Sequence, residues 1–307
     1  MKYAVIADVH GNYHALKLAI DDALSHGAEA FLFAGDYCVS APWPERVTER
    51  LMEMENGYVI RGNEEQYLTV PDGEDVQFDI SRFCRRTLSE KQKEWLLKRP
   101  ERIDMECQGV GIHMSHSSNA FIEDLEMAYA ATAKIAMHYP KGTTREEILR
   151  YVRSSLQGDE RFNGLVSELP KGVYIFGHTH VQWNMETEDR VFINPGSCGL
   201  PLDSEQFGAP YTLLTIEDEK VSVEEHRVLY DVQELIERVK GTDQYAQVKI
   251  WSEVIFKEWK TCREKVYFFL RYVEEYARQI GDERWPFMED TWTAAYEKWK
   301  ENHDTKW

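Results

Sequence analysis

The sequence has no long hydrophobic run and far fewer basic than acidic residues. No stretch of its 307 residues approaches the roughly 18 apolar residues that a membrane-spanning helix needs. Its 36 basic residues are outnumbered by 54 acidic residues, which gives a formal net charge of −18. Phosphate backbones and anionic lipids attract clustered Lys and Arg, so we expect no membrane partner and disfavour polymeric nucleic acid as a partner.

Cysteine is scarce, and no CxxC pair occurs. The five cysteines are Cys38, Cys84, Cys107, Cys198 and Cys262. An odd, scattered set predicts reduced, packed thiols rather than a disulfide framework or a structural zinc site. The short apolar run near the N-terminus reaches Asp8 too early for the apolar region of a signal peptide. It therefore predicts a first strand, and we expect a cytoplasmic protein.

The first sixty residues alternate between short apolar runs and helical periodicity. Runs at 2–7, 30–34 and 58–60 predict buried strands, whereas 13–26 and 44–56 predict helices. This order is typical of an α/β fold in which right-handed crossovers connect parallel strands. Ligands of such sheets gather where the strands end at their carboxyl edge.

The rest of the chain predicts two further regions. A helix is expected at 88–98, a hairpin at 102–107 and 110–115, and strands at 173–176, 191–194, 211–216 and 221–226. Helical patterns at 119–138 and 144–156 predict a cap insertion, at about 119–168, over one edge of the site. We expect a first domain at 1–230 and a helical extension at 231–307, whose aromatic residues form a helical core or the face of a homodimer.

Seven side chains that can bind metal ions lie at or near predicted strand ends. They are Asp8, His10, Asp36, Asn63, His116, His178 and His180. Carboxylate, amide and imidazole groups together suit Mn, Fe, Zn or Ni. Seven ligands are too many for one ordinary site and match two ions that share a carboxylate, an arrangement that promotes in-line displacement at phosphorus.

The order of these motifs resembles the calcineurin-like metallophosphoesterase family. The matching segments are Asp8-x-His10, Gly35-Asp36, Gly62-Asn63, His116 and Gly177-His178-x-His180. The segment Asn194-Pro195-Gly196-Ser197 is similar to small bacterial members, and the resemblance spans about residues 1–230. It implies a two-sheet αββα sandwich of the metallophosphoesterase type with a C-terminal helical appendage.

The resemblance also implies a role for each ligand. Asp8, His10 and His180 would bind one metal ion, and Asn63, His116 and His178 the other. Asp36 would bridge both ions. His113 competes with His116 for its role. We prefer His116 because it ends the strand and precedes a small residue, Ser117.

The implied reaction is hydrolysis of a phosphodiester or small phosphate ester by a metal-bridging hydroxide. Two divalent ions lower the pKa of a shared water from 15.7 towards about 7. Arg61 adjoins the third motif, where it either contacts a phosphoryl oxygen or packs on the sheet as a surface residue. Asp36, Glu64 and Arg61 are therefore the candidate catalytic residues.

Position 64 departs from the family pattern. The third motif usually continues Gly-Asn-His followed by an acid, and this histidine is thought to protonate the leaving group. Here the run is Gly62-Asn63-Glu64-Glu65. Either Glu64 is a general acid or the leaving group departs unaided, and nearby cations oppose the first role by lowering the pKa of a carboxyl group. We expect weak activity on poor leaving groups and better activity on activated aryl esters or diesters.

Other functions of the same fold stay open. Within the enzyme class, a serine/threonine-type protein phosphatase or a dinucleoside polyphosphatase is the alternative. In another class, a catalytically weak scaffold or binding module would keep the sandwich without the reaction. A scaffold has no need to keep every ligand, and all seven positions are filled here. The filled positions favour the enzyme.

Overall fold

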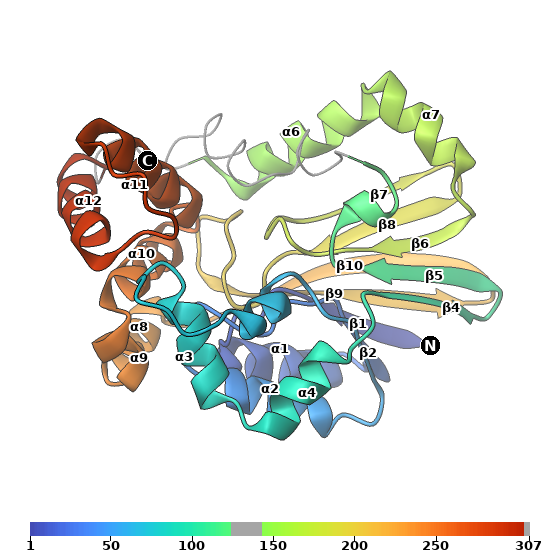
Figure 1. The fold of residues 1–307 in the computed structure, drawn as a ribbon. Coiled ribbons are helices and arrows are strands. Elements are labelled where there is room, and N and C mark those ends of the chain that lie inside the picture. The colour runs from blue at the N-terminus through green and yellow to red at the C-terminus, as the bar shows by residue number, and fades with distance from the viewer. Residues whose placement is uncertain (124–142, 304–307) are drawn as a thin grey trace.

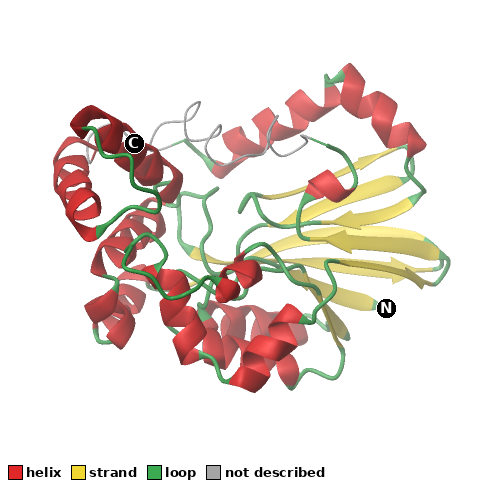
Figure 2. Ribbon diagram, viewed as in Figure 1, coloured by secondary structure: helices red, strands yellow, loops and turns green. Residues whose placement is uncertain are grey.

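Two mixed β-sheets lie face to face between layers of helices in the computed structural model, which describes residues 1–123 and 143–303 (Figures 1 and 2). The strands of the first sheet are β1 (Lys2–Ile6), β2 (Ala30–Phe33), β3 (Gly57–Val59), β9 (Gly208–Glu217) and β10 (Lys220–Leu229). Their order is β10-β9-β1-β2-β3. Strands β1, β2 and β3 are parallel, as the sequence predicts, while β9 and β10 pair in antiparallel fashion.

The second sheet has the order β4-β5-β6-β8-β7. Its strands are β4 (Arg102–Cys107), β5 (Val110–Ser115), β6 (Gly172–Ile175), β7 (Gln182–Thr187) and β8 (Arg190–Pro195). The hairpin of β4 and β5 is confirmed, and Gln108 and Gly109 form its turn with positive φ. Strand β7 was not expected from the sequence.

Alternating side chains of β1 bury both faces of the first sheet. Tyr3 and Val5 belong to the core between the sheets, where they meet Ile112 and Ile175 of the second sheet. Ala4 and Ile6 belong to the core on the outer face of the first sheet. A strand buried on both faces must be apolar at nearly every position, which explains the continuous run in the sequence.

Helices on the outer face of the first sheet complete that core. They are α1 (Tyr13–Ser25), α2 (Pro44–Met52), α3 (Asp79–Thr87) and α4 (Glu90–Leu97). Two short 3₁₀ helices are η1 (Glu64–Thr69) and η2 (Ser118–Ala120). Asn12 caps α1 by accepting a hydrogen bond from the Ala15 backbone N–H (3.1 Å), and Ser89 caps α4 in a capping box.

The described part of the segment expected to form a helical cap does not lie over the site. Helices α6 (Arg145–Gln157) and α7 (Glu160–Glu168) pack on the outer face of the second sheet rather than over the site. Their apolar residues, including Val152 and Phe162, bury against Trp183 and Phe192, and this large apolar surface explains their position. Of the helix expected at 119–138, residues 118–120 form η2, and residues 124–138 lie outside the described part.

The C-terminal region is helical, as expected. It comprises α8 (Val232–Lys240), α9 (Asp243–Gln247), α10 (Lys249–Thr261), α11 (Val266–Ile280) and α12 (Glu289–His303). In Figure 1 these orange and red helices lie beside the end of the sandwich. The Trp259 indole N–H donates to the Gly199 carbonyl (3.1 Å), and the Gln244 amide donates to the Ser40 carbonyl (2.7 Å). The extension is therefore fastened directly to loops of the sandwich.

The aromatic residues of the extension form a core of their own. The Phe269 ring lies 4.9 Å from the Trp292 ring and 5.2 Å from the Trp299 ring, measured between centroids. This is the helical core that the sequence offered as one alternative.

All five cysteines are free thiols, and four of them are buried. Within the described ranges, no helix is both long and apolar enough to span a membrane.

Candidate metal centre

The loops after β1 and β2 run side by side and carry three of the predicted ligands. The Asp8 backbone N–H donates to the Gly35 carbonyl and that of His10 to the Asp36 carbonyl, both at 3.0 Å. The Asp8 side chain is fully buried, and 2% of Asp36 is exposed. These backbone bonds fix Asp8 and His10 beside Asp36.

A buried carboxylate holds the Asp36 loop against the loop after β3. Glu65 is fully buried and accepts hydrogen bonds from the backbone N–H groups of Tyr37 (2.8 Å), Gly62 (2.7 Å) and Asp36 (3.2 Å). The Glu64 backbone N–H in turn donates to Asp36 Oδ1 (2.9 Å). Glu65 thus positions Asp36 without being a ligand itself.

His116 follows β5, and hydrogen bonds fix both the orientation and the tautomer of its ring. Its Nδ1–H donates to the Ala34 carbonyl at 2.7 Å. Its Nε2 lies 3.0 Å from Asn63 Oδ1 and 3.1 Å from Asp36 Oδ2. An imidazole held through one nitrogen presents the other to the centre, which is the usual arrangement of a metal-binding histidine.

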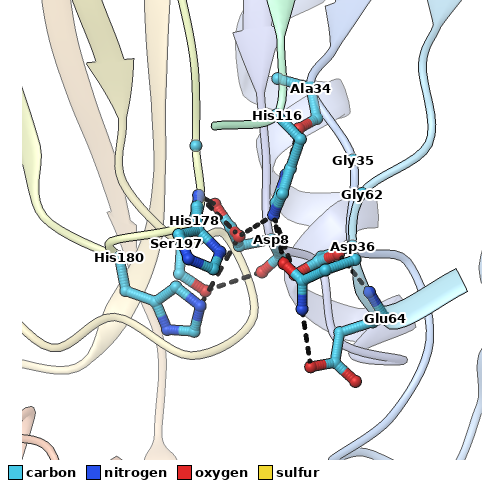
Figure 3. A network of polar contacts seen from close by, with 12 residues as sticks. Asp8, Ala34, Gly35, Asp36, Gly62, Glu64, His116, His178, His180 and Ser197 are labelled. Carbon is cyan, nitrogen blue, oxygen red and sulfur yellow. Dashed lines mark hydrogen bonds and ion pairs between the residues drawn. The ribbon is translucent and has the colours of Figure 1, made fainter. Parts of the chain in front are cut away.

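His178 and His180 follow β6 and approach the same centre. The His178 backbone N–H donates to both Asp8 carboxylate oxygens at 3.1 Å. His180 Nδ1–H donates to the Leu200 carbonyl at 3.1 Å, which leaves Nε2 3.0 Å from His10 Nε2 and 3.6 Å from Asp8 Oδ1. Figure 3 shows these side chains directed toward one another.

Residues at the end of β8 and directly after it support the loop that carries the two histidines. The Asn194 amide donates to the Gly177 carbonyl (2.8 Å) and to the Thr179 hydroxyl (3.0 Å). The Ser197 hydroxyl donates to the Asp8 carbonyl at 2.7 Å. The Asn-Pro-Gly-Ser segment therefore positions ligand loops, although none of its side chains belongs to either ligand cluster.

The predicted ligands form two adjacent clusters. Asp8, His10 and His180 make up one, and Asp36, His116 and His178 the other, with the donor atoms of each within 4.8 Å of one another. The clusters adjoin, because Asp8 Oδ1 lies 3.9 Å from His116 Nε2. Asn63 joins the second cluster through His116. The structure therefore brings together all seven residues.

The electrostatics of this centre fit a pair of cations. Burial raises the pKa of Asp8 well above its usual range, and the described residues include no Lys or Arg that pairs with Asp8 or Asp36. Burial also lowers the pKa of His10 to about 4 and that of His180 well below normal, so both imidazoles are neutral. Buried carboxylates beside neutral imidazoles form a suitable donor set for divalent metal ions.

His116 differs from the other histidines. Burial acts to lower its pKa, but the adjacent Asp36 carboxylate prevails and raises the pKa to about 10. For Asp36, burial acts to raise the pKa, and the charge of His116 overcomes this effect and holds the pKa below its usual range. A metal ion held by His116 Nε2 would require this nitrogen to be deprotonated, so metal binding at this cluster would be linked to release of a proton.

The backbone is strained at the ligands themselves. Asp8, His10, Asp36, His178 and His180 all have φ between 50° and 69°. Non-glycine residues adopt this region at a cost of roughly 1–3 kcal/mol when the surroundings enforce it, and such residues cluster at functional sites. Glycine is required beside them, because a Cβ on Gly62 would lie 2.1 Å from Asp36 Oδ1 and one on Gly177 2.6 Å from Asp8 Oδ2.

The other candidate residues lie as follows. Glu64 lines the cavity beside the ligands and accepts a hydrogen bond from the Asn63 amide (3.3 Å). Burial, followed by the charge of Asp36, raises the pKa of Glu64 well above its usual range. The Arg61 guanidinium donates to the Leu97 carbonyl (3.2 Å) and to Glu101 (2.5 Å), whereas His113 contacts Asp104 (2.6 Å) rather than either ligand cluster.

The sequence indicated the ligands but not their supports. In the sequence, Glu65 only matches the acid of the third motif, and the carbonyl groups of Ala34 and Leu200 carry no side-chain signal. The Asn-Pro-Gly-Ser segment is the sequence signal for the loop that ends at Ser197.

A cavity of about 590 Å³ opens beside the candidate ligands, with His10, Asp36, Asn63, Glu64, His178 and His180 in its wall.

Comparisons with known proteins agree with this architecture. The chain is similar in fold to a metallophosphoesterase from Sphaerobacter thermophilus (TM-score 0.56, 17% identity, 85% of this chain and 100% of that chain). It is also similar to a hypothetical protein from Pyrococcus horikoshii (TM-score 0.57, 17% identity, 83% and 97%). No curated protein matches the chain. The model of the calcineurin-like phosphoesterase superfamily domain matches residues 1–219, so the chain belongs to this superfamily.

Proposed function

We propose that the protein is a dinuclear metal-dependent phosphoesterase that hydrolyses a phosphodiester or a small phosphate ester. The observation that carries this proposal is the pair of adjoining donor clusters. Their carboxylates are buried and have no lysine or arginine counterion among the described residues. Asp8, His10 and His180 would hold one ion, Asn63, His116 and His178 the other, and Asp36 both. Mn, Fe, Zn and Ni all suit these donors.

The chain prepares this site before substrate arrives. When bound, two such ions lower the pKa of a shared water and offset the charge of the phosphoryl oxygens. The carbonyls of Ala34 and Leu200 orient the imidazoles of His116 and His180, and Glu65 fixes the Asp36 loop. Because these groups are already in position, little free energy is needed to order the ligands.

Glu64 and Arg61 have different standing in this proposal. Glu64 lines the cavity at the metal centre, so its carboxyl group is the candidate that donates a proton to the leaving group. The Arg61 guanidinium is engaged with Leu97 and Glu101. These contacts support the interpretation of Arg61 as a residue that packs on the sheet.

The test is hydrolysis of bis-p-nitrophenyl phosphate together with metal analysis of the purified protein. We expect about two divalent ions per chain and turnover with Mn that a chelator abolishes and added Mn restores. Asp36→Asn should abolish turnover, while Glu101→Gln, at an exposed ion pair outside the cavity, should leave it intact. A folded protein that turns over no mono- or diester with Mn, Ni, Zn or Fe would favour the scaffold alternative.

A further inference from the structure

The cavity beside the metal centre has a second wall that the proposed chemistry does not use. This wall, called here the aromatic wall, consists of Tyr67, Phe78, Trp251, Tyr267 and Trp285. Tyr67 and Phe78 come from the segment after β3, whereas the other three come from the C-terminal helices and the loop between α11 and α12. Segments about 200 residues apart in the sequence thus face the ligands across one cavity.

Three of the five side chains of the aromatic wall are exposed, although a folded protein normally buries such side chains. The exposed fraction is 40% for Tyr67, 45% for Tyr267 and 63% for Trp285. Large apolar side chains gathered at one opening mark a binding surface rather than random exposure. Here the surface is continuous with a metal centre, so its occupant is part of the molecule whose phosphate the metal centre would hold.

Hydrogen bonds position the part of the aromatic wall that lies at the start of α11. Glu258 is buried and accepts from the backbone N–H groups of Lys265 (2.7 Å) and Val266 (2.8 Å) at the start of α11. Glu264 accepts from the Tyr267 backbone N–H at 2.9 Å. The Tyr67 and Phe78 rings, which belong to the same wall, lie 6.1 Å apart between centroids. Because these contacts already order Tyr267, Tyr67 and Phe78, less conformational entropy is lost when a flat ligand binds there.

The charges of the cavity limit what else the ligand carries. Among the described residues that line it, Asp36, Glu64, Glu258 and Glu264 are acidic, and none is a lysine or an arginine. A second phosphate or a carboxylate beyond the metal centre would therefore meet no cationic side chain among these residues. The lining therefore disfavours polyphosphates.

Resting on the proposed phosphoesterase function, we propose that the aromatic wall binds an uncharged aromatic ring, of the kind a nucleobase supplies, on a substrate with a single phosphate group. The phosphate lies at the ligand clusters and the ring stacks against Trp285 and Tyr267. Stacking on aromatic side chains tolerates any base, because every base has a π-face. The substrate class is thus a nucleoside phosphate ester with one phosphorus atom.

The experiment compares ligands that differ only in the ring. The affinity of Mn-loaded protein is measured by calorimetry for thymidine 5′-monophosphate and for 2-deoxyribose 5-phosphate, which lacks the base. Thymidine 5′-diphosphate and phosphorylcholine complete the series. We expect the base to improve affinity about tenfold and the second phosphate to add nothing. Quenching of tryptophan fluorescence by the monophosphate provides a second readout.

Variants test whether the gain comes from the aromatic wall. Trp285→Ala and Tyr267→Ala should each remove most of the tenfold gain and leave the affinity for 2-deoxyribose 5-phosphate unchanged. Their exposure predicts that both variants fold, which thermal unfolding verifies. Tyr58→Ala is the matched control, because Tyr58 is 42% exposed and lies outside the cavity.

The outcomes separate this inference from the proposed function. Equal affinities with and without the base, or tighter binding of phosphorylcholine than of the thymidine monophosphate, would overturn the inference even if bis-p-nitrophenyl phosphate is hydrolysed. A gain from the base that depends on Trp285 would support it even if no ester is turned over, and the proposed function alone would then fail.

Discussion

At the scale of single residues, substitution of Glu65 tests whether this residue supports the candidate ligands by positioning the Asp36 loop. Glu65→Gln replaces one acceptor oxygen with an N–H₂ group that faces a backbone N–H group of the Asp36 or Gly62 loop. A buried donor left unsatisfied costs about 1–3 kcal/mol. We expect a loss of that size in the free energy of unfolding, measured in urea, together with weaker metal binding.

Glu101→Gln is the control for this substitution. The ion pair of Glu101 with Arg61 is partly exposed, and exposed pairs contribute about 0–1 kcal/mol. It should change neither the unfolding curve nor the metal content appreciably. Wild-type stability and metal content in Glu65→Gln would show that the three hydrogen bonds do not hold the Asp36 loop.

Glu64 carries a prediction about the leaving group. If its carboxyl group donates a proton, Glu64→Gln should slow hydrolysis of alkyl esters much more than hydrolysis of p-nitrophenyl esters, whose leaving group needs no proton. Glu64→His should then speed the turnover of alkyl monoesters. Rates for both ester classes give the answer, and equal effects of Glu64→Gln on the two would refute the acid role.

The proximity of the candidate ligands could be predicted from the sequence because strand ends are marked locally. Each ligand loop follows a short apolar run, and parallel strands bring their carboxyl ends to one edge. The positive φ values at Asp8 and His178 could not be predicted, since tertiary contacts impose them. Nor could the roles of Ala34 and Leu200, which act through backbone carbonyl groups.

At the scale of elements, Glu258 links α10 to the start of α11 and makes stability depend on pH. Burial, followed by the nearby Glu264, raises the pKa of Glu258 well above the ordinary value of 4.5. The folded state therefore holds this proton more tightly than the unfolded state, and stability falls as pH rises from about 4.5 through the folded pKa. Glu258→Gln should remove this part of the loss.

Urea unfolding at pH 5 and pH 8 measures the difference. The variant keeps a carbonyl oxygen for the Lys265 and Val266 amides, so it should fold at both values. We expect Glu258→Gln to gain stability relative to the wild type at pH 8 and little at pH 5. Glu283→Gln, at an exposed position, serves as the control. The prediction fails if both variants follow the wild-type pH profile.

Helices and strands with a clear hydrophobic pattern could be predicted from the sequence. Elements whose buried face is set by tertiary packing could not. The central strands β1, β2 and β6 carry apolar runs, whereas β7 (QWNMET) contains polar residues at four of its six positions and has no such signal. Helix α3 was also not identified, since its buried positions include Ser81 and Arg82. For α6, the period predicts an apolar face but not which surface that face will cover.

At the scale of the whole molecule, metal ions should contribute to stability. The carboxylates of Asp8 and Asp36 are buried close together, and their neutralisation by cations favours the folded state. A ligand present at 100 times its Kd stabilises by about 2.7 kcal/mol. We expect the Tm to rise on addition of Mn and to fall with a chelator, and Asp36→Asn to blunt the response.

A third cluster provides the control. Asp22 lies on α1, His26 directly follows that helix and His226 lies on β10, and the three share no residue with the two candidate clusters. Asp22→Asn should leave the Mn response and the count of about two tightly bound ions unchanged. If the Tm of the wild type did not change when metal is added and removed, metal ions would not stabilise the folded state, and the prediction would fail.

The cavity shows the limit of prediction at this scale. No sequence pattern predicts that Trp285 and His180 line one cavity, because periodicity indicates which face of a helix is buried and not what that face packs against. The C-terminal aromatic residues divide between two environments, with Phe269 and Trp292 in a helical core and Tyr267 and Trp285 at the cavity.

The contacts that hold the C-terminal helices against the sandwich also affect how a substrate can reach the candidate metal centre. Trp259 and Gln244 bond to the loops at Gly199 and Ser40, and Leu200 and Phe207 share a core with Ile255. Moving these helices away from the sandwich would break those contacts, so we expect them to stay in place during a reaction cycle. A substrate would then have to fit the cavity of about 590 Å³ as it stands, which limits the size of the group that can accompany the phosphate.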